Sequence, residues 1–159
     1  MEKTGKILAI TITSVLFLSG MLGVYANGGN GGEPGGCTPG YWKNHQDAWI
    51  PTDIDPTEEV GAWFPGALVP YPDLASANLL DALSFKKGRD LEGAARILLR
   101  QAVAALLNAA HPDIDYQMEE DNIINAVNNA LNSGDRDIML NLKDELDYYN
   151  NLGCGVCND

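Results

Sequence analysis

Apolar residues recur at helical spacing through the C-terminal half of the chain. A first predicted helix over 74–85 has three leucines on one side, namely Leu79, Leu80 and Leu83. The next and longest helix should begin after Asp90, which is a good N-capping residue, and end near residue 110, before Pro112. Its second half has no polar residue from 102 to 107. We therefore expect this helix to be buried on all sides at the centre of the fold.

Two further amphipathic helices are predicted towards the C-terminus. The first covers 118–131, and its expected inward stripe is Ile123, Val127 and Leu131. The last begins near Asp135 or Asp137, and its expected buried residues are Ile138, Leu142, Leu146 and Tyr149. The pattern predicts an all-α fold, a small bundle of about four main helices plus a short N-terminal helix.

The short N-terminal helix is expected within residues 37–49. Thr38 can cap it, with Pro39 at its first position. Trp42, His45 and Trp49 recur at spacings of three and four, which places them on one helical face. We expect this face to dock on the core.

Residues 50–72 interrupt the helical pattern. Five prolines rule out a long helix there, and the first half of the segment is acidic. We expect a loop pinned by Trp63, Phe64 and Tyr71. A loop of this length is uncommon in a compact domain and is often functional.

The first 26 residues are typical of a signal peptide. Lys3 and Lys6 precede an apolar run over 7–22, and Ala26 closes a good cleavage site. An uncleaved membrane anchor is the alternative, because 7–25 is just long enough to span a bilayer. A Gly-rich linker over 27–36 would then lead into a helical domain over 37–159.

The charge of the chain restricts its partners. Cleavage would remove Glu2, Lys3 and Lys6, leaving 8 basic and 21 acidic residues and a net charge of −13. Such a surface repels nucleic acid and anionic lipid, so we expect no nucleic-acid partner and membrane contact only through an uncleaved N-terminus. Other cell-surface proteins, or a second copy of the chain, are the partners expected.

Three blocks of the sequence resemble a domain that recurs in secreted and cell-surface proteins of bacteria and archaea. The first is Cys37 with Gly40-Tyr41-Trp42-Lys43-Asn44-His45 and Trp49; the second is the pattern of leucines, alanines and Asn108 over 98–110; the third is Leu146-Asp147-x-Tyr149-Asn150-Asn151 leading to Cys154. The resemblance implies export and a cysteine at each end of the domain. It implies no activity, and Cys157 is additional to its pattern.

The cysteines of an exported domain usually form disulfides. We expect Cys37 to pair with Cys154, whose position is fixed by the end of the last helix, and Cys157 to be the spare or alternative partner. Cys37, His45, Cys154 and Cys157 are also the ligand types of a Cys₃His zinc site, which is the alternative for these residues. Redox catalysis by the C-x-x-C pair is disfavoured because the pair follows a helix C-terminus among acidic residues.

These observations favour a secreted or cell-surface structural or interaction module that has no catalytic activity and no cofactor. Tyr41, Trp42, Lys43, Asn44, His45 and Trp49 are its expected surface or packing motif. An exported enzyme of unknown reaction and a metal-stabilised binding domain are the two alternatives.

Overall fold

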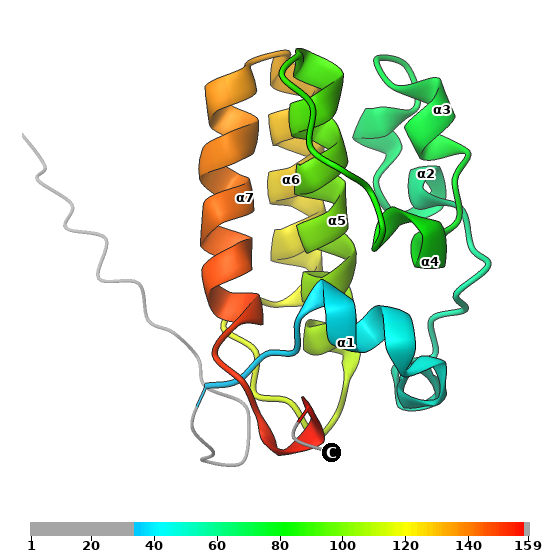
Figure 1. The fold of residues 1–159 in the computed structure, drawn as a ribbon, viewed down its shortest axis with the longest axis vertical. Coiled ribbons are helices and arrows are strands. Elements are labelled where there is room, and N and C mark those ends of the chain that lie inside the picture. Colours follow the sequence, from blue (N-terminus) through cyan, green and yellow to red (C-terminus); the bar gives the residue numbers. More distant parts are fainter. Residues whose placement is uncertain (1–33, 158–159) are drawn as a thin grey trace, which may run out of the picture.

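The computed structural model describes residues 34–157. Three long helices, α5 (Leu91–Ala110), α6 (Glu120–Ser133) and α7 (Arg136–Asn150), stand side by side, and α5 packs against both of the others (Figure 1). The predicted all-α fold is confirmed. The proposed signal peptide at 1–26 and most of the linker at 27–36 lie outside the described residues.

The ends of the long helices follow from their sequence. The Asp90 side chain caps α5 by accepting a hydrogen bond from the Gly93 backbone N–H at 2.8 Å. At the other end, the residue before Pro112 is already extended. Gly134, in the left-handed conformation with φ 62°, ends α6, and Asp135 then caps α7. The short connection between these caps makes α6 and α7 antiparallel neighbours.

The predicted helix over 74–85 is wrong. The structure has two short helices there, α3 (Pro72–Ala75) and α4 (Leu79–Ala82). The backbone between them bonds instead to the segment before α2 (Val60–Trp63): the Val60 N–H donates to the Ala77 carbonyl and the Leu79 N–H to the Glu58 carbonyl, both at 2.9 Å. These bonds to a distant segment replace the internal ladder of one continuous helix.

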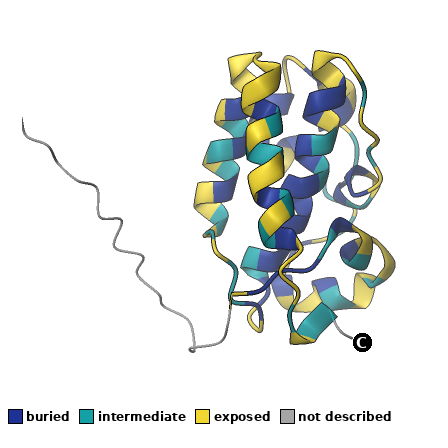
Figure 2. Ribbon diagram, turned by 60° about the vertical axis from the view of Figure 1, so that its left-hand side comes forward, coloured by how far each residue is buried: buried dark blue, intermediate teal, exposed yellow. Residues whose placement is uncertain are grey.

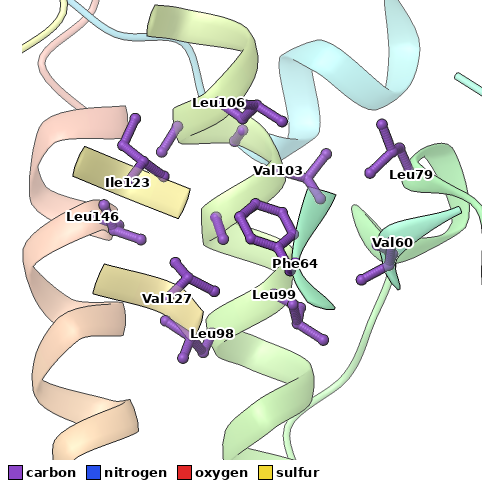
Figure 3. Packing of buried hydrophobic residues seen from close by; sticks show 14 of the residues in the cluster. Val60, Phe64, Leu79, Leu98, Leu99, Val103, Leu106, Ile123, Val127 and Leu146 are labelled. Carbon is purple, nitrogen blue, oxygen red and sulfur yellow. The ribbon is translucent and has the colours of Figure 1, made fainter. Parts of the chain in front are cut away.

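The segment over 50–72 also contains more structure than a loop. Part of η1 (Gln46–Thr52), then α2, then η2 (Pro65–Ala67) occupy it as short turns of helix. Prolines begin η2 and α3, where the missing N–H is no loss. Phe64 is fully buried and projects from this segment between the side chains of α5 and α6 (Figure 3).

The core is built around α5. Residues 102–107 are all buried, as the apolar run predicted, and the outer faces of α6 and α7 are exposed (Figure 2). The predicted stripe of α6 is confirmed, since Ile123, Val127 and Leu131 are buried. On α7 the prediction was largely wrong: of its four residues only Leu146 is buried, Leu142 and Tyr149 are half-buried, and Ile138 is 47% exposed. Met139, the residue after Ile138, is buried in its place. No helix within residues 34–157 has the length and apolar character needed to cross a membrane.

Candidate functional site

The N-terminal block forms two helical turns rather than one helix. Helix α1 (Pro39–Asn44) begins at the Thr38 cap and ends before His45, and η1 begins at the next residue. Both Trp42 and Trp49 are buried, and the Trp49 ring N–H donates to the Trp42 carbonyl at 2.9 Å. The block therefore docks on the core as expected, but through two elements that the Trp49–Trp42 hydrogen bond joins.

Tyr41 and His45 are half-buried at the edge of the core. The His45 ring stacks on the Tyr41 ring, with centroids 4.3 Å apart, and its Nδ1 is 2.9 Å from the Tyr41 carbonyl oxygen. Asn44 donates back to the Gly40 carbonyl, and Lys43 is exposed. These contacts are local to α1.

A buried asparagine joins α5 to the start of the domain. The Asn108 side chain is fully buried, and its Oδ1 accepts from the Cys37 backbone N–H at 2.8 Å and from the Trp42 indole N–H at 3.1 Å. Its Nδ2 donates to the Cys37 carbonyl and to Asn150 Oδ1, both at 2.9 Å. All of its hydrogen-bonding capacity is used.

Asn150 extends the same network to α7. Its Oδ1 also accepts from the Tyr116 hydroxyl at 2.8 Å, and its Nδ2 donates to the side-chain and backbone oxygens of Gln101. Burial raises the pKa of Tyr116, so its hydroxyl stays protonated and continues to donate. Gln101 Nε2 in turn donates to Asp147 at 2.9 Å, which carries the network to the surface.

This network was not predicted as a site. A signal was present for Asn108, because it is the polar residue that directly follows the apolar run of α5. A fully satisfied buried network fixes the relative positions of the elements it joins, because any shift would leave a polar group unpaired. Here those elements are the domain's first residues, α5 and α7.

The two ends of the described chain meet next to this network. Gly36 and Gly153 exchange backbone hydrogen bonds at 3.4 and 3.0 Å, and the tail then turns through η3 (Gly155–Cys157). A disulfide joins Cys37 to Cys157, with the two Cα atoms 5.6 Å apart. The free Cys154 has its Sγ 3.3 Å from that of Cys37 and 3.0 Å from that of Cys157.

The expected pairing of Cys37 with Cys154 therefore differs from the structure. The prediction relied on the last helix to fix Cys154, but the η3 turn, with the Cys157 N–H donating to the Cys154 carbonyl at 3.2 Å, also brings Cys157 back onto Cys37. Cys37 is still bonded to the C-terminal tail. Cys157, named from the sequence as the alternative partner, forms the bond.

Three sulfur atoms, but no histidine, gather in this cluster. The sulfurs of Cys37, Cys154 and Cys157 all lie within 4.8 Å of one another, the spacing of a metal-ligand group. His45 does not belong to the group; its Nδ1 is engaged with the Tyr41 carbonyl. The Cys₃His set is thus not assembled among the described residues, and only its three cysteines come together.

The other histidine has a structural environment. His111 is 5% exposed, packs at an angle to the Trp42 ring, and its Nδ1 accepts from the Asp113 backbone N–H at 3.2 Å. Burial lowers the pKa of His111, and the Asp113 carboxylate opposes this in part. Within residues 34–157 neither histidine is hydrogen-bonded to a cysteine or serine side chain, so the geometry forms no Cys–His or Ser–His pair there.

Comparison of the chain with protein-family models, curated proteins and solved structures gave no match.

Proposed function

We propose that this chain is an exported structural or interaction module of the cell surface, without catalytic activity. The observation that carries the proposal is the disulfide between Cys37 and Cys157, which links positions 120 residues apart at the two ends of the described domain. Such bonds persist in oxidising compartments and are rare in the cytosol. In the chain-entropy model, closing a loop of this size stabilises the folded state by about 4–5 kcal/mol.

The arrangement around the bond supports a holding role. Cys37 is fully buried and its backbone is bonded on both sides to Asn108, so the start of the domain is fixed by packing as well as by sulfur. A domain closed in this way can present its surface to a partner without fraying at its ends. We propose other cell-surface proteins, or a second copy, as that partner.

The test begins with protein recovered from the growth medium or the cell surface of the producing cells. N-terminal sequencing should give Asn27, and peptide mapping without reductant should give a Cys37–Cys157 peptide. Recovery in the cytosol with three reduced thiols would contradict the proposal. A start at Met1 in the membrane fraction would support the anchor in place of the cleaved signal.

A metal-stabilised domain is the second candidate, because the three sulfurs already have the spacing of a ligand group. Metal binding needs all three as thiolates, so the disulfide and the metal are mutually exclusive states. The variant Cys154→Ser separates them. In the disulfide form this substitution should have little effect on stability, whereas in a metal form it removes a ligand. Elemental analysis of protein purified under reductant, as parent and variant, should show one zinc per chain in the parent alone if this second candidate is correct.

A further inference from the structure

One hollow on the surface gathers basic side chains from three parts of the fold. It has a volume of about 410 Å³ and lies against α5 and α7. Its cations are Lys86 and Lys87 from the connection before α5, Arg100 from α5, and Lys143 from α7. The site is separate from the cysteine cluster and shares with the buried network only Gln101 and Asp147.

The charge of this hollow is opposite to that of the molecule. The chain has only 10 Lys and Arg residues and a net charge of −12, yet four of those cations line this one hollow. Asp147 is the single carboxylate among the lining residues. The lining residues therefore sum to three positive charges in a chain of net charge −12, and Asp144, which pairs with Lys143, offsets one of them.

The carboxylate of Asp147 already has partners within the chain. Asp147 Oδ1 accepts from Gln101 at 2.9 Å and from Asn151 at 3.0 Å, and its Oδ2 is 3.5 Å from Lys143 Nζ. Lys143 also pairs with Asp144. The hydrogen bond with Asp144 is the main reason why the pKa of Lys143 is raised, so this ammonium stays charged.

Three of the four cations have no carboxylate partner within residues 34–157: Lys86, Lys87 and Arg100. Arg100 also lacks a hydrogen bond: its Nε is buried and has no hydrogen-bond partner among the described residues. An unsatisfied donor on a charged group is unfavourable and rare in folded proteins. Because Arg100 lines the hollow, an acceptor from outside the chain would bond to the terminal nitrogens of the same guanidinium.

We propose that this hollow binds a small molecule through a phosphate or sulfate group, with Arg100 as the central contact. The planar guanidinium matches the oxygens of such a group with two parallel hydrogen bonds, and the lysines supply further charge. Phosphate and sulfate offer two negative charges against the local excess, where a carboxylate offers one. The volume of the hollow exceeds that of a bare ion and falls in the range of small-molecule sites.

The proposal is tested by calorimetric titration of the full exported protein with inorganic phosphate, inorganic sulfate and acetate, at constant ionic strength. Phosphate or sulfate should bind more tightly than acetate. Arg100→Gln should weaken the binding roughly tenfold to a hundredfold, since charged hydrogen bonds are lost. The matched control is Arg96→Gln, one turn earlier on α5, whose guanidinium is exposed and pairs with Glu92. It should bind as the parent does.

A second variant covers the case in which Arg100→Gln disturbs the fold. Lys86→Gln with Lys87→Gln changes two exposed residues outside the helices, so folding should be unaffected while affinity falls. Affinity equal to that of the parent in this double variant and in a folded Arg100→Gln protein would overturn the proposal. So would the absence of phosphate and sulfate binding by the parent at millimolar concentrations.

Discussion

At the scale of single residues, the side chain of Asn108 makes the backbone hydrogen bonds that a neighbouring strand would make. Its carboxamide accepts from the N–H and donates to the C=O of Cys37, the same pair of bonds that an adjacent backbone would make. This satisfies both backbone polar groups of the buried Cys37, which have no helix or sheet partner. The same side chain also holds the indole of Trp42 in place.

Asn108→Ala should therefore be among the most destabilising single changes in the chain. It leaves the Cys37 N–H and the Trp42 indole N–H buried without an acceptor, and each lost acceptor costs about 1–3 kcal/mol. We expect the free energy of unfolding in urea to fall by about 2–6 kcal/mol. Asn129→Ala, at an exposed position on α6, is the control and should change it by less than about 0.5 kcal/mol. A variant at Asn108 that unfolds at the parental urea concentration would show that the network is dispensable.

His111 should make stability depend on pH. Its folded pKa lies below the ordinary value of 6.5 because of burial, so the unfolded chain binds the proton more readily. This contribution to stability is complete at higher pH and is lost as pH falls below 6.5. Protonation would also remove the Nδ1 acceptor that faces the Asp113 N–H.

Thermal unfolding at about pH 7.5 and about pH 5.5 measures this effect. The parent should be less stable at the lower pH, and His111→Gln should show a smaller difference between the two. His45→Gln, which changes the partly exposed histidine, should keep the parental difference. An equal difference in all three proteins would assign the pH dependence to other groups.

At the scale of elements, the long helices could be predicted and the short ones could not. Helix α5 was recognisable because its cap at Asp90, its apolar second half and its stop before Pro112 all agree. The region around Asn78 has equally good local signals for a helix. They are overridden by the backbone bonds between 77–79 and 58–60, which no local pattern reveals.

Part of the candidate site could also be predicted from the sequence, and part of it could not. Docking of Trp42 and Trp49 could be predicted from their size alone, because two indoles in a small domain are rarely left exposed. The partner of Cys37 could not, since Cys154 and Cys157 lie within one turn of each other and both reach it. The cations of the basic hollow come from 86–87, 100 and 143, and only the packing of α5 on α7 brings them together.

The start of α5 packs against the chain that precedes it without room for a side chain. A Cβ atom added at Gly93 would overlap the backbone of Gly88. Gly93→Ala should therefore lower the unfolding free energy by about 1–3 kcal/mol, although alanine is the better helix former.

Gly40→Ala is the matched control. Gly40 also lies in a helix, but the nearest atom to an added Cβ is Thr38 Oγ1 at 3.6 Å, an ordinary contact. This variant should be neutral or stabilised by up to about 1 kcal/mol. Thermal melts of the two variants give the comparison, and equal melting temperatures would mean that α5 can shift away from Gly88 at little cost.

At the scale of the whole molecule, the start of the described chain and its C-terminal tail meet at one end of the bundle (Figure 1). The backbone pair of Gly36 and Gly153 and the disulfide lie together there. The folded domain is thus a loop closed at one place, with the three long helices inside it.

Cys154 should be able to take the place of Cys157 in the disulfide. Cys157→Ser should let Cys154 bond to Cys37, because their sulfurs are already 3.3 Å apart, and most of the stability should remain. Cys154→Ser should change little, since it leaves the existing bond intact. Cys37→Ser should lose the full loop contribution of about 4–5 kcal/mol.

Urea unfolding of the three oxidised variants, with thiol counting, measures this order. The parent treated with reductant should match Cys37→Ser, apart from local packing of the new hydroxyl. If Cys157→Ser were instead as unstable as Cys37→Ser and kept two free thiols, Cys154 would not replace Cys157 and the prediction would be wrong.

Closure at one end also determines how the domain would respond to a pulling force. When the chain is stretched from the residues before Cys37 and those after Cys157, the load passes from one sulfur to the other across Cα atoms 5.6 Å apart. The helices between them lie outside the line of tension. In an oxidising medium the domain would therefore transmit force through a covalent bond and keep its fold, whereas reduction would place its whole length under load.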